Sequence, residues 1–60
     1  MRLLSVYEFC KQSGISRALF YKLVREGKGP RIMKVGRRTL VSCQAAEEWQ
    51  HTMEVPRQAA

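Results

Sequence analysis

Five residues at helical spacing form the clearest candidate site in the sequence. At 100° per residue, one side of the segment 17–26 carries three cations, a phenol and a small side chain: Arg17, Lys22, Arg25, Tyr21 and Ala18. The opposite side carries Phe20, Leu23 and Val24, with Leu19 at its margin. Cationic and hydroxyl groups presented together donate hydrogen bonds to anions and other acceptors. The pattern therefore predicts a binding surface for a polyanion rather than a site that breaks bonds.

The residues that could support catalysis or hold a metal form no recognised arrangement. Cys10 and Cys43 lie among apolar residues, which predicts buried, reduced thiols. Together with His51 they fall short of the four ligands of a structural zinc site, so no metal or cofactor is expected. No histidine–acid pair is available to activate a serine, and three serines are interpreted instead as helix caps: Ser5, Ser16 and Ser42. We therefore expect a protein that is not an enzyme.

Length and charge narrow the class of protein further. The chain has 60 residues and a formal net charge of +6, which predicts one small domain. Residues 1–40 hold ten basic and two acidic residues, whereas residues 41–60 hold one basic and three acidic residues. This asymmetry favours one surface that meets a polyanion such as nucleic acid. No apolar run approaches the ~20 residues of a membrane span, and no signal-peptide pattern occurs, so a cytoplasmic protein is expected.

Two short helices separated by a glycine turn are predicted in the first half of the chain. Ser5 and Glu8 have the spacing of a capping box, and apolar residues then recur on one helical face over 6–13. Gly14 ends this helix and Ser16 caps the next one, which is predicted over 17–26 and stops at Gly27. A helix, a tight turn containing glycine and a second helix are the signature of a helix-turn-helix.

A β-hairpin and a third helix are predicted in the second half. After Pro30, the β-prone runs 31–35 and 39–41 flank Gly36-Arg37-Arg38, which predicts a hairpin with a basic tip. A helix follows over 43–53, and Trp49 lies on its inward stripe, where it is interpreted as a core residue. The domain is predicted over 1–53, with a flexible tail over 54–60.

These elements predict an α+β, mainly helical fold, the winged helix-turn-helix, with a two-stranded wing. The second helix has the size to enter the major groove of double-stranded DNA, where base edges are distinguishable, and the basic wing can reach an adjacent groove or the backbone. The predicted DNA-binding residues are Ser16, Arg17, Ala18, Tyr21, Lys22, Arg25, Lys34, Arg37 and Arg38.

The predicted core is small, which favours a monomer of modest stability. Its members are Leu4, Val6, Phe9, Ile15, Phe20, Leu23, Val24, Ile32, Val35, Leu40, Ala46 and Trp49.

The segment 3–50 resembles the excisionase-like, AlpA-type members of the MerR-like winged-helix superfamily. The matching stretches are Leu4-Ser5-Val6 with Glu8, Gly14-Ile15-Ser16-Arg17, Phe20-Tyr21-Lys22-Leu23-Val24 with Glu26-Gly27, Pro30, Lys34-Val35-Gly36-Arg37-Arg38 and Trp49. Members of this family often carry small polar residues where this chain has Ala18 and Leu19, so their hydroxyl contacts to DNA do not transfer.

The resemblance implies a bacterial or phage-encoded protein that binds DNA and performs no chemistry of its own. The first hypothesis is an excisionase, or recombination directionality factor. Such a protein binds and bends attachment-site DNA, with a tyrosine integrase and neighbouring copies of itself as partners. The second hypothesis is a small transcriptional regulator that uses the same surface at a promoter. The third is a protein-interaction module or inhibitor that keeps the fold without binding DNA.

Overall fold

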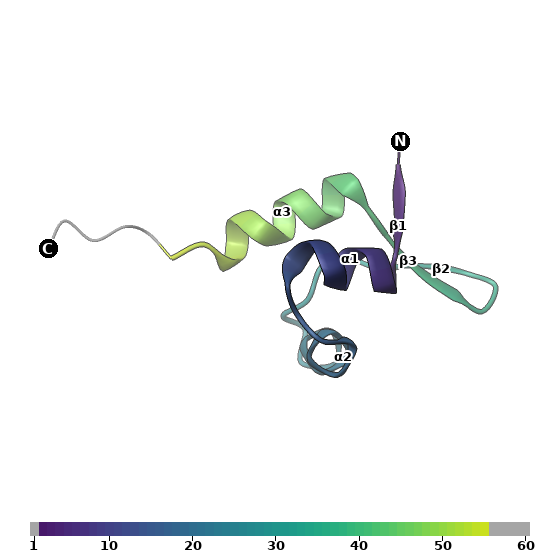
Figure 1. The fold of residues 1–60 in the computed structure, drawn as a ribbon, viewed down its shortest axis with the longest axis horizontal. Helices are drawn as coiled ribbons and strands as arrows, with labels where there is room; N and C mark the ends of the chain where they lie inside the picture. Colours follow the sequence, from purple (N-terminus) through teal and green to yellow (C-terminus); the bar gives the residue numbers. More distant parts are fainter. Residues whose placement is uncertain (1, 56–60) are drawn as a thin grey trace, which may run out of the picture.

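The computed structural model describes residues 2–55, which form three helices and a three-stranded sheet (Figure 1). In chain order the elements are β1 (Leu3–Ser5), α1 (Val6–Ser13), α2 (Arg17–Arg25), β2 (Met33–Val35), β3 (Arg38–Ser42) and α3 (Cys43–Met53). The predicted mainly helical α+β fold, the winged helix-turn-helix, is confirmed. Of the predicted tail over 54–60, residues 56–60 lie outside the described part of the chain.

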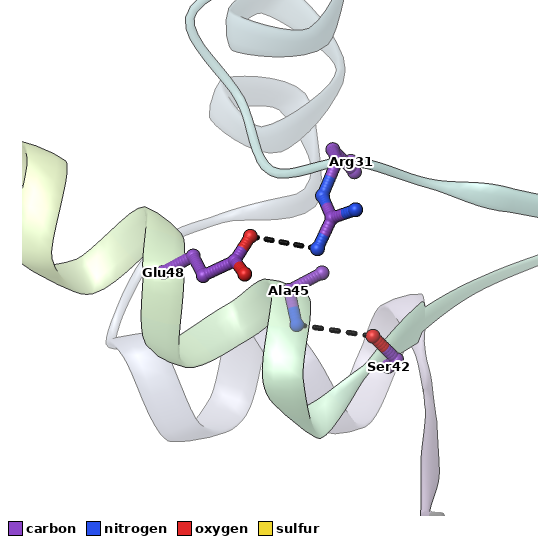
Figure 2. Close-up of polar contacts among 4 residues, drawn as sticks. All are labelled: Arg31, Ser42, Ala45 and Glu48. Atoms are coloured by element: carbon purple, nitrogen blue, oxygen red, sulfur yellow. Dashed lines mark hydrogen bonds and ion pairs between the residues drawn. The ribbon is translucent and has the colours of Figure 1, made fainter.

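The three predicted serine caps are confirmed. The Ser5 hydroxyl accepts from the Glu8 N–H at 3.0 Å, and the Ser5 N–H donates to the Glu8 carboxylate at 2.9 Å, which completes the capping box. Ser16 accepts from the Leu19 N–H at 3.0 Å. Ser42 accepts from the Ala45 N–H at 3.0 Å (Figure 2). Each of these bonds satisfies a backbone donor that the first turn of a helix leaves without an intrahelical partner.

Helix α2 ends at Arg25, one residue earlier than predicted. Gly27 adopts a left-handed φ of 73°, which lets the chain reverse without a steric penalty. The Gly27 N–H then donates to the Val24 carbonyl at 3.1 Å, and the Lys28 N–H donates to the Leu23 carbonyl at 2.8 Å. This pair of bonds is a Schellman motif. It explains why α2 ends here and directs the chain back toward the rest of the fold.

Strand β3 is the centre of the sheet, with β1 and β2 antiparallel on either side. Strand β1 was not predicted, because three residues are too few to show an alternating pattern and their partner strand lies far along the chain. The hairpin is also shorter than predicted on its first side, since β2 begins at Met33. Val35 pairs with Arg38, so the turn contains only Gly36 and Arg37, and Arg38 belongs to β3.

The core lies where α1, α2, α3 and the base of the sheet meet. Its buried members are Leu4, Val6, Phe9, Cys10, Phe20, Val41, Ala45 and Ala46, with Ile15, Val24, Cys43 and Trp49 packed against them. Phe9 is central, because its ring makes edge-to-face contacts with Phe20 at 5.4 Å and with Trp49 at 5.3 Å between centroids. The prediction that Trp49 is a core residue is therefore confirmed.

Two residues of the predicted core are exposed. Ile32 and Val35 lie in and beside β2, which projects away from the helices as part of the hairpin (Figure 1), and they are 38% and 52% exposed. Val41 is buried instead, since it lies at the base of the hairpin opposite Leu4. The sheet therefore contributes to the core only at its base, and its outer end is free to carry the wing.

Candidate nucleic-acid interface

Helix α2 has one buried side and one exposed side, as the spacing of its residues predicts. Phe20 is its buried residue. All five predicted contact residues of the helix are exposed, namely Arg17, Ala18, Tyr21, Lys22 and Arg25. No acidic residue lies in the first turn of α2, although Glu8 occupies that position in α1. The N-terminus of α2 thus keeps the partial positive charge that favours a phosphate group.

A shallow pocket of about 280 Å³ lies between α2 and the hairpin. Two of the predicted residues of α2, Arg17 and Tyr21, line it together with Arg37 and Arg38 of the hairpin. The fold therefore brings three cations and a phenol from two distant segments to one place. The Tyr21 ring packs edge-on against Phe20, with 5.1 Å between centroids, which limits the positions that the phenol can take.

The other predicted residues do not line this pocket. Ser16 caps α2 through its hydroxyl, and Ala18, Lys22 and Arg25 lie elsewhere on the exposed part of α2. The Lys34 ammonium donates to the Thr39 hydroxyl at 3.1 Å across the two strands of the hairpin. Because Thr39 lines the pocket, this bond connects Lys34 with the pocket's edge.

Four residues of the pocket were not predicted as part of the site: Ser5, Val6, Tyr7 and Thr39. Tyr7 is 64% exposed, and it also forms part of the pocket wall. The signal that could have identified these residues is the pairing of β1 with β3, in which Ser5 lies opposite Leu40, next to Thr39. That pairing brings the start of α1 beside the hairpin.

Glu8, which follows Tyr7 of the pocket wall, is engaged within its own helix end. The backbone N–H of Ser5 is the main cause that lowers the pKa of the Glu8 carboxyl, and the charges of Arg2 and Arg38 lower it further. Glu8 is therefore ionised and accepts a hydrogen bond from Ser5, and its carboxylate interacts electrostatically with Arg38. The surface around the pocket nevertheless stays positive, because Arg17, Arg37, Arg38 and Arg2 outnumber this carboxylate.

The candidate reactive groups lie outside the pocket. Burial raises the pKa of the Cys10 thiol, although the charge of Arg17 acts in the opposite direction, so the thiol is protonated and unreactive at neutral pH. His51 is exposed beside Glu54, with 3.3 Å between Nδ1 and the carboxylate. Within residues 2–55, no three His, Cys, Asp or Glu side chains are close enough to hold a metal ion. No helix in this part of the chain could span a membrane.

One of three comparisons with known proteins identifies a family. No curated protein and no solved structure matches the chain significantly. One family model does match, that of the prophage CP4-57 regulatory protein AlpA, and it covers residues 2–54, from the start of β1 to the C-cap of α3. The chain therefore belongs to the family of the prophage regulatory protein AlpA, which indicates a phage-type regulatory DNA-binding protein.

Proposed function

We propose that the chain binds double-stranded DNA in a sequence-specific manner, with α2 in the major groove and the β2–β3 hairpin as a wing on the neighbouring backbone or groove. The observation that carries this proposal is the pocket in which Arg17 and Tyr21 of α2 meet Arg37 and Arg38 of the hairpin. When α2 lies in the major groove, the phosphate backbone at the edge of that groove passes beside this pocket. Arginine is suited to that position because its planar guanidinium donates several hydrogen bonds to phosphate.

At the level of biological role, the proposal is an excisionase that binds the attachment region of a prophage or integrative element and bends it for a tyrosine integrase. The protein acts without a cofactor or a catalytic step, in the cytoplasm and at the nucleoid. The exposed face of α2 and the adjoining basic wing support this role, because a protein that holds the duplex through both a helix and a wing can stabilise a bend.

Transcriptional regulation is the second candidate role, and the family's description as a prophage regulatory protein favours it. Both roles use the same DNA-binding surface, so they differ in the DNA site and in the partner rather than in the fold. A regulator binds a promoter and changes transcription without an integrase. An excisionase changes the yield of a recombination reaction that the integrase performs.

A pair of assays tests the proposal. Mobility shifts at low salt on attachment-region and promoter fragments test DNA binding, and the absence of any shift would favour the protein-interaction hypothesis. Excision of a plasmid-borne element by the integrase, with and without the protein, is then compared with a promoter reporter. A rise in excision without a change in transcription supports the excisionase role, and the reverse result supports the regulator.

A further inference from the structure

The linker between α2 and β2 is bound to α3 by two side-chain contacts. The Trp49 indole N–H donates to the carbonyl of Lys28, with 2.9 Å between the nitrogen and the oxygen. The Arg31 guanidinium forms an ion pair with Glu48 at 2.6 Å, and Figure 2 shows it reaching from the linker toward α3. The two contacts hold both ends of the linker, and they come from consecutive residues of one helix.

The same linker also packs closely on α2. A side chain at Gly29 would meet the Cγ2 atom of Val24 at 3.0 Å and the Val24 backbone nitrogen at 3.1 Å. Only glycine allows this approach without a shift of the neighbouring backbone. Pro30 is buried beside it, and its ring restricts the backbone. The linker therefore connects the C-terminal end of α2 to α3 through close contacts on both sides.

Helix α2 has a single buried residue, Phe20, and Val24, one turn later, packs partly buried against the core. Contacts from neighbouring turns of a short helix restrain its direction less than contacts that also hold its end. The linker supplies a contact at the C-terminal end of α2, where the Schellman motif passes directly into Lys28. This contact further restrains the direction of the helix axis.

We propose that Glu48 and Trp49 are positioning residues, which set the direction of α2 through the 28–31 linker and so determine how its exposed face meets base edges. Neither residue needs to touch DNA for this effect. The contribution to overall stability is small for Glu48, because its ion pair with Arg31 is exposed, with 70% and 54% of the two side chains accessible. This inference rests on the proposed function for its effect on DNA recognition, whereas the effect on α2 exists in the free protein.

Conservative variants separate positioning from folding. Trp49→Phe keeps an aromatic ring against Phe9 and removes the indole N–H, and Glu48→Gln keeps the size of the side chain and removes its charge. Glu47→Gln is the matched control, since it removes the same charge from an exposed neighbour on α3. The double variant combines Trp49→Phe with Glu48→Gln. If it is too unstable to fold, the same measurements are made on the single variant Glu48→Gln.

The first measurement is made without DNA. Residual dipolar couplings of backbone N–H groups report the direction of α2 relative to α1 and α3. We expect the double variant to change the couplings of α2 while those of α1 and α3 keep their relative values, and we expect no change in the control. Unchanged α2 couplings in the folded double variant would overturn the proposal, whatever the DNA experiments give.

The second measurement compares binding to a duplex selected in vitro with the wild-type chain and to a scrambled duplex of equal length. We expect the ratio of the affinity for the selected duplex to the affinity for the scrambled duplex to fall by about three- to tenfold in the double variant. A change of this size is typical of one or two lost hydrogen bonds, and the affinity for the scrambled duplex itself should change little. An equal loss on both duplexes, or an unchanged ratio despite altered couplings, would contradict the positioning role. Failure of the wild-type chain to bind any duplex would instead reject the proposed function. The residual dipolar couplings would then still test whether Glu48 and Trp49 set the direction of α2.

Discussion

Removal of the two wing arginines gives the sharpest test of the proposed DNA-binding surface. Arg37 lies in the two-residue turn and Arg38 is the first residue of β3, and both line the pocket that they share with α2. If each arginine contacts one phosphate, Arg37→Ala combined with Arg38→Ala removes about 1.8 from the slope of log affinity against log salt concentration. The loss of affinity caused by the double substitution is therefore about 60-fold larger at 0.1 M salt than at 1 M salt, a difference of about 2.5 kcal/mol.

Fluorescence anisotropy of a labelled duplex, titrated at several salt concentrations, measures both quantities. The matched control replaces both residues by lysine, which keeps the charge and loses the planar fork of the guanidinium. We expect the lysine pair to retain the salt slope of the wild-type chain and to lose only those contacts that need two parallel hydrogen bonds. An alanine pair with an unchanged salt slope would refute the assignment of the hairpin as a wing that contacts phosphate.

Three further changes test the recognition helix, the α1 cap and the core. We expect Arg17→Ala and Arg25→Ala each to weaken site-specific binding by about 1–3 kcal/mol if the residue reads a base edge, whereas an equal loss on random duplex would show a phosphate contact only. Because the Ser5 N–H lowers the pKa of the Glu8 carboxyl in the folded state, Glu8 stabilises the fold above its ordinary pKa of 4.5 and loses this effect as pH falls through the lowered value. Glu8→Gln should therefore flatten the acidic side of a plot of Tm against pH, and an unaltered plot would contradict the capping box. Phe20→Ala should cost about 3–5 kcal/mol, comparable with a total of about 3–9 kcal/mol for a chain of this length, and chemical denaturation should show far less effect for Leu19→Ala.

The helices were predictable because their signals are local. Ser5, Ser16 and Ser42 each precede a helix whose first residue was placed correctly, and Gly14 ends α1 with a left-handed φ of 71°. A cap acts through hydrogen bonds to residues two or three positions away, so the sequence alone contains both partners. Helical periodicity also depends only on residues close in the sequence, so the exposed face of α2 could be predicted from the spacing of its residues.

The features that escaped prediction depend on contacts between distant segments. Strand β1 exists because Leu4 pairs with Val41, and a three-residue strand has no pattern of its own. Ile32 and Val35 have apolar side chains typical of a core, but their burial depends on whether a helix covers the hairpin, and none of the described helices does. Tyr7 lines the pocket because the pairing of β1 with β3 places the start of α1 beside the hairpin, and this pairing also joins distant segments.

The acidic residues near the C-terminal end show how the structure changes the meaning of a charge pattern. After position 40 the chain has three acidic residues and one basic residue, the reverse of the excess before it. Glu48 is paired with Arg31 and Glu54 lies beside His51, so two of the three carboxylates already have partners within the described residues. A basic partner that docks on α3 would have to compete with Arg31 for Glu48, which would remove one of the two contacts that hold the 28–31 linker and leave the bond from Trp49 to Lys28. If the direction of α2 depends on both contacts, the binding of a partner and the recognition of DNA would be coupled through this linker.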